Sequence, residues 1–231
     1  MEYTAVGLLG KACPCRRGQS RLAPVKLEVL KYPDPRLRRK GLSVTAVSDE
    51  HRELVKNMIE TMYAENGIGL AAPQVGESLR LLVIDTRPTD DDGNPTDEGL
   101  TDLEKKVKQP IAIFNPEIVV QKDLTDYEEG CLSVPGFFET VERALYVEVK
   151  GLDENGQELV IKTDGLLAIC LQHEMDHLEG KLFIDRLSFI KSNKIKNKIK
   201  KSGYPTPDEV AEERQKVREA RAKQKQEASK K

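Results

Sequence analysis

Tryptophan is absent from this chain of 231 residues, and phenylalanine and tyrosine bring the aromatic share to only 5%. The hydrophobic core must therefore be mostly aliphatic. Cysteine is scarce as well, and 4 cysteines in a chain of this length do not make the disulfide framework of a small secreted domain. No apolar run approaches the roughly 18 residues that a membrane-spanning helix needs. These absences favour a globular protein with reduced cysteines in a cytosol-like compartment, without a membrane partner.

Charged residues, in contrast, make up 33% of the chain and are unevenly distributed. The net charge is −2, from 37 Lys and Arg against 39 Asp and Glu. Residues 191–231 contain 14 basic and 6 acidic residues, a balance of +8, which leaves 23 basic and 33 acidic residues, a balance of −10, for residues 1–190. A basic tail on an acidic body predicts contact with an anionic partner such as RNA, or equally a solvated helix without a partner.

Residues 1–25 form a separate basic segment, in which Glu2 is the only acidic residue. Their apolar patch, at residues 5–9, is too short for a secretory signal. We expect a disordered arm here. The composition is also compatible with a transit peptide, which leaves import into an organelle open.

Periodicity and turn signals predict a single α+β domain over residues 26–190. Apolar residues on one stripe predict a helix over residues 49–66. Short apolar or alternating runs predict strands at residues 79–85, 111–120 (interrupted by Asn115-Pro116), 144–150 and 158–163. Asn155-Gly156 is a hairpin turn signal between the last two strands. Residues 86–109 are predicted to form a polar surface loop with at most a helical turn.

A second helix is expected from Gly165 to about Leu178, capped by Asp164 and ended by Gly180. Its first turns are apolar on more than one side, which is typical of a buried helix. We therefore expect this helix to lie at the centre of an α+β fold, packed among antiparallel β-sheets with other helices at the periphery. A further helix and then a helical or disordered basic tail are expected over residues 191–231.

The most informative stretch is His173-Glu174-Met175-Asp176-His177, an H-E-x-x-H pattern within the expected central helix. Histidines four residues apart lie on one face of a helix, so both imidazoles can reach one metal ion. Glu174 lies beside that face, where its carboxylate can accept a proton from a water molecule at the metal without itself being a ligand. The pattern predicts metal-assisted hydrolysis.

A hydrolytic metal site needs a third protein ligand and keeps one position open for water. The longer pattern of known zinc proteases fits poorly, because Phe183 stands where that pattern has its next ligand. Cys131 is the best remaining candidate, and its thiolate suits Fe²⁺, Co²⁺, Ni²⁺ or Zn²⁺. Cys170 lies three residues before His173 on roughly the same helix face, so a closed, structural Cys₂His₂ site is the alternative.

Three segments together resemble the signature motifs of the peptide deformylases, in the order of that family. They are Gly67 to Gln74, Glu129 to Ser133 and Gln172 to His177. The resemblance covers roughly residues 27–188. It implies removal of the formyl group from N-formylmethionine at the start of nascent polypeptides, with one metal ion, physiologically Fe²⁺. It also implies a cytoplasmic enzyme of a bacterium, or a counterpart in an organelle.

The resemblance assigns catalytic roles to individual residues. The metal would be held by Cys131, His173 and His177. Glu174 would take a proton from water and later deliver it to the departing amine. The side-chain amide of Gln74 and the backbone N–H of Leu132 would stabilise the negative charge that grows on the formyl oxygen.

The resemblance also implies residues that contact the substrate. They are Gly67, Ile68, Gly69, Tyr127, Gly130, Leu166, Ile169 and Cys170. Ordinary turns would equally explain the glycines, and core packing would explain the apolar residues. Glu129 and Arg143 would form either a buried ion pair that supports the Cys131 loop or a plain surface pair.

Two other functions remain open. An H-E-x-x-H metallopeptidase would cleave internal bonds of unformylated substrates. A non-catalytic RNA-binding module would use the metal structurally and would bind nucleic acid with a steep salt dependence. The basic tail would also serve a deformylase, by holding it against ribosomal RNA. The long loop at residues 86–109 departs from the family pattern and leaves the strand boundaries there open.

Overall fold

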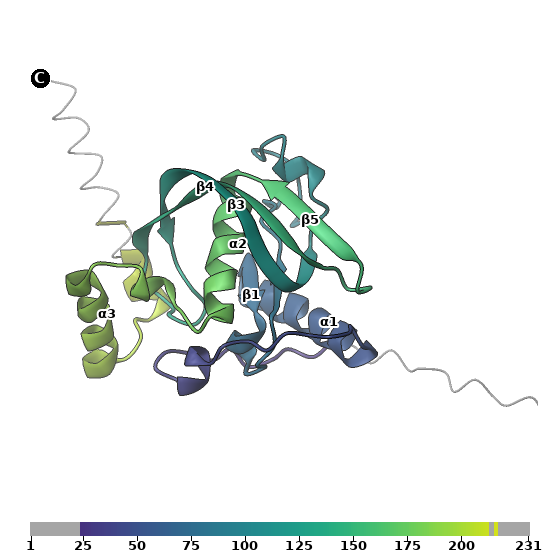
Figure 1. The fold of residues 1–231 in the computed structure, drawn as a ribbon. Helices are drawn as coiled ribbons and strands as arrows, with labels where there is room; N and C mark the ends of the chain where they lie inside the picture. Colours follow the sequence, from purple (N-terminus) through teal and green to yellow (C-terminus); the bar gives the residue numbers. More distant parts are fainter. Residues whose placement is uncertain (1–23, 213–214, 217–231) are drawn as a thin grey trace, which may run out of the picture.

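A computed structural model describes residues 24–212 and 215–216 of the chain (Figure 1). Five strands form one antiparallel sheet in the order β1-β2-β3-β4-β5. The strands are β1 (Gly69–Ala71), β2 (Leu81–Ile84), β3 (Ile111–Glu129), β4 (Glu139–Leu152) and β5 (Glu158–Thr163). The α-helices are α1 (Asp49–Ala64), α2 (Gly165–Leu178) and α3 (Phe189–Ser202). Short 3₁₀ turns are η1 (Pro35–Arg38), η2 (Ala72–Val75), η3 (Glu104–Lys106) and η4 (Phe183–Asp185).

This mixture of helices with an antiparallel sheet confirms the fold class expected from the sequence, although the strands form one sheet. Of the N-terminal arm expected at residues 1–25, residues 1–23 lie outside the described part of the chain. Residues 213–214 and 217–231 of the basic tail also lie outside it. Within the part of the chain that the structure describes, no helix combines the length and the apolar character that crossing a bilayer requires.

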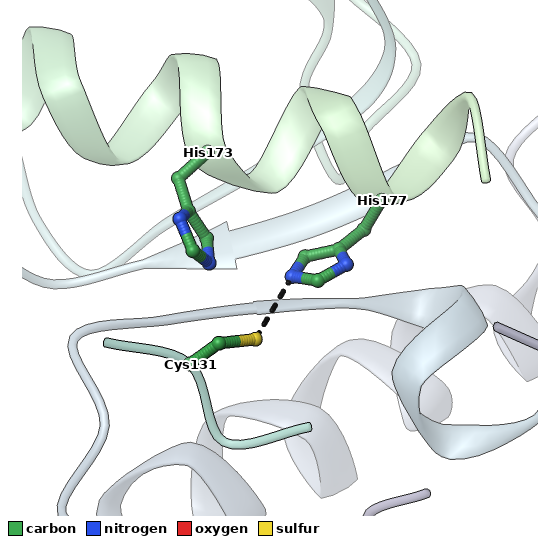
Figure 2. A group of neighbouring side chains, drawn as sticks. All are labelled: Cys131, His173 and His177. Atoms are coloured by element: carbon green, nitrogen blue, oxygen red, sulfur yellow. Dashed lines mark hydrogen bonds between the residues drawn. The ribbon is translucent and has the colours of Figure 1, made fainter. Parts of the chain in front are cut away.

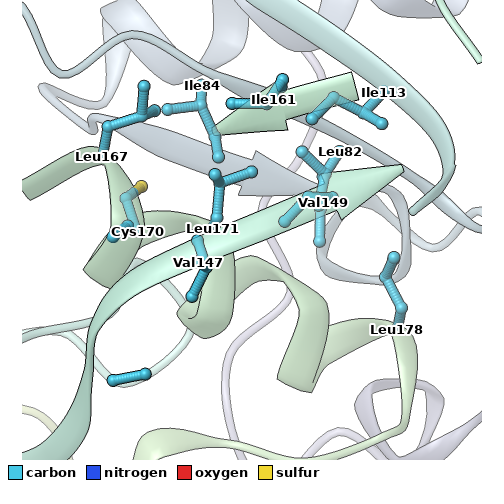
Figure 3. Packing of buried hydrophobic residues seen from close by; sticks show 13 residues of the cluster. Leu82, Ile84, Ile113, Val147, Val149, Ile161, Leu167, Cys170, Leu171 and Leu178 are labelled. Carbon is cyan, nitrogen blue, oxygen red and sulfur yellow. The ribbon is translucent and has the colours of Figure 1, made fainter. Parts of the chain in front are cut away.

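α2 lies at the centre of the fold, where it packs against β4, β1 and β2 (Figure 1). Nearly every residue of this helix from Leu167 onward is buried. Its apolar side chains belong to a cluster with residues from all five strands, and Figure 3 shows those of β2 to β5 around Leu171. A helix that is apolar on several sides can bury all of them only in such a central position.

β2 separates two parts of the core, because successive side chains of a strand point to opposite faces. Leu82 and Ile84 face α2, whereas Leu81 and Val83 face α1. This two-sided burial explains why β2 is a continuous apolar run. Met58 and Met62 of α1 are fully buried in the second cluster.

A third apolar cluster connects α3 to the loop that follows β3. Ile195 and Ile199 of α3 pack with Val134 and Phe137 of that loop and with Phe183 of η4. The first part of the predicted basic tail is therefore packed on the folded core.

β3 is much longer than the strand predicted at residues 111–120. The chain does deviate at Asn115, whose φ is +50°, and the pairing register with β4 shifts there, but the strand continues to Glu129. The residues from 121 to 128 are polar or exposed because this arm of the β3–β4 hairpin projects into solvent. The apolar pattern that marks a buried strand is therefore missing from this arm. For the same reason β4 begins at Glu139, earlier than predicted.

The predicted capping of α2 by Asp164 is wrong in one respect. Asp164 does occupy the position before the first helical residue, but its side chain makes no hydrogen bond to the helix. It accepts one from the hydroxyl group of Thr101 in the β2–β3 loop. The boundaries of α2, in contrast, agree with the sequence prediction.

Candidate active site and metal centre

The two histidines of the H-E-x-x-H pattern lie one turn apart on the face of α2 that points toward the loop after β3 (Figure 2). Their ring centroids are 5.0 Å apart with an interplanar angle of 75°. Cys131 projects from that loop toward them, with its Sγ 3.3 Å from Nε2 of His177. One donor atom from each of Cys131, His173 and His177 lies within 4.8 Å of the others, as a shared metal ion requires.

The electrostatic surroundings of Cys131 favour the thiolate, the form in which cysteine binds metals. Burial alone would oppose the charge, but the positive potential and hydrogen bonds of His177 and His173 outweigh it. The pKa of Cys131 is lowered to about 5. A thiolate and two imidazoles that converge in this way form a donor set that fits a divalent transition metal.

Glu129 fixes the orientation of His173. Its Oε2 lies 2.8 Å from Nδ1 of His173, and Arg143 donates to both of its oxygens at 2.6 and 2.9 Å. Burial opposes the charge on Glu129, but these hydrogen bonds lower its pKa to about 2. An ionised carboxylate can only accept, so Nδ1 of His173 carries the proton and Nε2 is left for a metal.

Arg143 continues this network to the far side of α2. Its Nη1 donates to Asp176 at 2.6 Å, and Asp176 also accepts two hydrogen bonds from Arg186. The side chains of Arg143 and Glu129 are almost completely buried. The ion pair expected from the sequence is therefore present in its buried form, and it is part of a longer chain of charges that includes Asp176.

Glu174 is buried beside the donor set, and its Oε2 has no hydrogen-bond partner among the described residues. Burial is the main cause that raises its pKa to about 7; the charges of Cys131 and Glu129 add to this effect, and the two histidines oppose it. A buried carboxylate oxygen without a partner is costly, so a group that is not protein fits here. Water at a metal ion would satisfy it.

Gln74 is held in one orientation by η2 and its neighbours. Its Oε1 accepts a hydrogen bond from the backbone N–H of Ala71 at 2.7 Å. Its Nε2 therefore faces the site, where it donates to the hydroxyl group of Ser133 at 3.3 Å and lies 3.7 Å from Sγ of Cys131. The amide donor is thus aimed at the region next to the candidate metal ligands.

A cavity of about 410 Å³ opens onto this group of side chains. It is lined by residues that the sequence singled out: Gly67, Ile68, Gly69, Gln74, Tyr127, Gly130, Cys131, Leu132, Leu166, Ile169, Cys170, His173 and Glu174. His177 lies behind the cavity wall and is almost fully buried. The structure thus brings the metal, proton-transfer and substrate candidates to one place.

Gly69 lies where the β1 backbone passes closest to α2. A Cβ atom at this position would lie 2.7 Å from Sγ of Cys170 and would collide with the carboxylate of Glu174. Only glycine allows the strand edge to come this near to the carboxylate of Glu174.

Sequence reasoning missed Phe138, which lines the cavity together with Pro135, Gly136 and Asn66. The ring of Phe138 fills the space that a Cβ atom at Gly130 would need, with Cε1 2.5 Å from that position. The signal in the sequence was Phe137-Phe138 shortly after Cys131, two of only 5 phenylalanines in the chain.

Cys170 does not belong to the donor set. Its Sγ lies 3.6 Å from the carbonyl oxygen of Ile68, and burial raises the pKa of its thiol well above the ordinary value. The side chain also packs in the apolar cluster around α2. This geometry disfavours the closed Cys₂His₂ alternative.

Another cavity, of about 500 Å³, lies behind α2 and is lined by Arg80, Arg143, Asp176 and Arg186 among others. These charged side chains are already paired with one another or with neighbours such as Glu129 and Glu179. Although it is larger, it contains neither the donor set nor the unpartnered carboxylate. The reactive groups converge on the smaller cavity.

Most of the chain is similar in sequence and in structure to proteins of one known family. Residues 26–193 match the family model described as polypeptide deformylase. The peptide deformylase of Cellvibrio japonicus is 46% identical over 176 residues, which cover 76% of this chain and 94% of that protein. The crystal structure of a peptide deformylase from Legionella pneumophila is 43% identical, with a TM-score of 0.65, over 77% of this chain and 95% of that one. A class I type b peptide deformylase from Acinetobacter baumannii, solved with bound Met-Ala-Ser, is 32% identical, with a TM-score of 0.62, over 71% and 100% of the two chains.

Proposed function

The chain belongs to the polypeptide deformylase family, and on this premise we propose that it removes the N-terminal formyl group of formyl-methionine from newly synthesised polypeptides and releases formate. The observation that carries the proposal is the convergence of Cys131, His173 and His177 within 4.8 Å, with Glu174 in the same cavity. A base next to an open metal position is the arrangement that hydrolysis of an amide requires.

We assign one divalent metal ion to Cys131, His173 and His177, with Fe²⁺ as the physiological ion and Zn²⁺, Ni²⁺ or Co²⁺ as substitutes. The lowered pKa of Cys131 and the protonated Nδ1 of His173 support this set. When bound, such an ion lowers the pKa of water toward neutrality and polarises a carbonyl oxygen. The single thiolate makes an Fe²⁺ form sensitive to oxidation.

Glu174 takes a proton from the attacking water and passes it to the nitrogen that departs as the new amino terminus. Its pKa of about 7 in the metal-free protein suits a group that must both accept and release a proton near neutral pH. Its burial keeps bulk water away from this transfer.

Negative charge grows on the formyl oxygen as the carbon becomes tetrahedral. The Nε2 amide of Gln74, already oriented toward Cys131, and the backbone N–H of Leu132 are the donors that we assign to it. Such donors act on the transition state more than on the substrate, so they lower the barrier.

The substrate backbone would run along the edge of β1, beside Gly67, Gly69 and Gly130, which line the cavity. The methionine side chain would enter the apolar part of the cavity. Its wall is formed by Ile68, Tyr127, Leu166, Ile169 and Cys170. Aliphatic and aromatic groups suit the polarizable thioether of methionine.

The basic tail, residues 191–231, would hold the catalytic domain, residues 26–190, near ribosomal RNA. In α3, Lys191 and Lys196 form ion pairs with Glu139 and Asp185 at 2.8 and 3.3 Å. Three other exposed lysines of this helix, Lys194, Lys200 and Lys201, are better candidates for phosphate contacts.

Truncation at residue 190 would remove Ile195 and Ile199 from the core, so charge reversal is the cleaner test of ribosome binding. Changing Lys194, Lys200 and Lys201 together to Glu should weaken co-sedimentation with ribosomes. A matched control changes the exposed Lys105, Lys106 and Lys108 to Glu. Equal co-sedimentation of both variants and the parent protein would refute a role for α3.

The bacterial cytoplasm is the location that we propose.

Formate release from formyl-Met-Ala-Ser, measured anaerobically with Fe²⁺ or with Ni²⁺, tests the proposed activity. We expect turnover by the parent protein and a loss of several orders of magnitude in the Glu174→Gln variant. A casein assay in parallel tests the metallopeptidase alternative, and tight, salt-sensitive RNA binding without turnover would indicate the binding-module alternative. Absence of formate release from protein that contains one metal ion per chain would refute the proposal.

A further inference from the structure

Glu104 is a buried carboxylate in the polar loop between β2 and β3. The residue is only 2% exposed. Its Oε1 accepts a hydrogen bond from the backbone N–H of Leu167 at 2.9 Å, and its Oε2 accepts one from the backbone N–H of Thr101 at 2.8 Å. Leu167 is the third residue of α2. A residue of the loop thus caps the helix that carries the H-E-x-x-H pattern.

Helix N-terminal N–H groups need an acceptor, and the preceding residue usually supplies one. In this protein the side chain of Asp164 makes no such bond, and it accepts a hydrogen bond from the hydroxyl group of Thr101. The carboxylate of Glu104 takes over this role, with a negative charge at the positive end of the helix dipole.

Gly165, the first residue of α2, makes room for this carboxylate. Its φ is +62°, in the left-handed region that favours glycine. A Cβ atom at this position would lie 2.8 Å from the carboxyl carbon and both oxygens of Glu104. Glycine at position 165 and glutamate at position 104 therefore fit each other.

The two halves of α2 are anchored by different groups. In the second half, His173 is held by Glu129, and Asp176 is held by Arg143 and Arg186. The first half carries Leu166 and Ile169, which line the cavity. The side-chain hydrogen bond to its first turn comes from Glu104.

We infer that Glu104 is a positioning residue for the methionine pocket: by capping α2 at Leu167, it holds Leu166 and Ile169 in place as the pocket wall. This inference rests on the proposed function, since it concerns the substrate of the same site. Without the cap, the first turn would occupy its binding-competent conformation for a smaller fraction of the time. The apparent dissociation constant is the intrinsic one divided by that fraction, so a smaller fraction weakens substrate binding.

Steady-state kinetics of Glu104→Ala with formyl-Met-Ala-Ser tests the inference. We expect KM to rise about fivefold, the factor that corresponds to one lost helix cap, while kcat stays within about twofold. Glu104→Gln keeps one acceptor oxygen and should show an intermediate KM. Glu98→Ala, an exposed residue of the same loop, is the matched control and should leave both constants unchanged. An unchanged KM, or a fall in kcat alone, would overturn the inference.

Amide hydrogen exchange gives a second readout that does not need activity. Exchange at residues 166–170 should be faster in Glu104→Ala than in the parent protein or Glu98→Ala, with little change at residues 173–177. Should the alanine variant fail to fold, Glu104→Gln decides the question alone. Unchanged exchange at residues 166–170 would overturn the inference even if the protein is a deformylase. Absent turnover in the parent protein would refute the proposed activity but leave the cap testable.

Discussion

Nδ1 of His173 lies 2.8 Å from the carboxylate of Glu129. This contact turns Nε2 of the ring toward the site, and it is itself secured by the two hydrogen bonds from Arg143. The orientation of His173, a candidate metal ligand on α2, therefore depends on a charged network that reaches Asp176 and Arg186 on the other side of the helix.

Replacing Glu129 by Gln should weaken metal binding. A neutral amide accepts the Nδ1 proton of the His173 imidazole more weakly than a carboxylate does, and changes in such supporting residues typically cost about 10- to 100-fold in metal affinity. The measurement is the metal content after dialysis against graded chelator. Glu142→Gln, at an exposed position of β4, is the control. If both variants retained metal equally, the supporting role of Glu129 would be wrong.

The lowered pKa of Glu129 predicts how the stability of the chelator-treated protein depends on pH. The folded pKa of Glu129, about 2, lies below its ordinary value of 4.5. Its contribution to the free energy of unfolding is therefore fully present above about pH 4.5 and is lost as the pH falls toward 2. The shift corresponds to roughly 3 kcal/mol as an upper figure.

Urea unfolding of the parent protein and of Glu129→Gln at several pH values between 3 and 6 checks this prediction. As the pH falls, the free energy of unfolding should decrease more steeply for the parent protein than for Glu129→Gln. The difference in this free energy between the two proteins should therefore become smaller. Parallel curves would contradict the predicted shift.

Replacing Gln74 by Met should reduce kcat about 100-fold, because it removes one donor to the developing oxyanion. Methionine has a similar length and no amide, so the metal ligands should be unaffected. Anaerobic kinetics and metal analysis of the same sample separate the two effects. A variant with normal kcat would remove Gln74 from the catalytic groups, and one without metal would show that Gln74 supports the ligands instead.

Replacing Cys170 by Ala should leave the metal content at one ion per chain, because Sγ of Cys170 faces the carbonyl oxygen of Ile68 and lies outside the donor set. Removing a buried sulfur should cost some stability, on the order of 1 kcal/mol, through lost packing. Metal analysis together with a thermal melt measures both. Stoichiometric loss of metal would indicate the closed Cys₂His₂ site.

Local patterns were enough to predict the helix that carries His173 and His177, its end near Leu178, and the strand over residues 158–163. Each follows from neighbours in the sequence, such as apolar periodicity and turn residues. The outer arm of β3 could not be predicted in this way, because its residues 121–128 contribute little to the core and carry no apolar alternation.

In the candidate site, too, features set by neighbours in the sequence could be predicted, whereas features set by tertiary contacts could not. Spacing within one helix predicted that His173 and His177 share a metal, and the Cys131 motif predicted the third donor. The cap from Glu104 to Leu167 joins residues 63 positions apart, and the contact of Phe138 with Gly130 depends on how the loop after β3 folds back. Such tertiary contacts leave no periodic signal in the sequence.

The central claim is that one sulfur atom and two imidazoles bind a single metal ion and leave a position for water. X-ray absorption spectroscopy of the Zn²⁺-loaded protein tests it most directly. The account predicts one sulfur neighbour at about 2.3 Å and nitrogen or oxygen neighbours at about 2.0–2.1 Å, with the sulfur neighbour lost in Cys131→Ala. Two sulfur neighbours, or a sulfur neighbour that persists in Cys131→Ala, would contradict it.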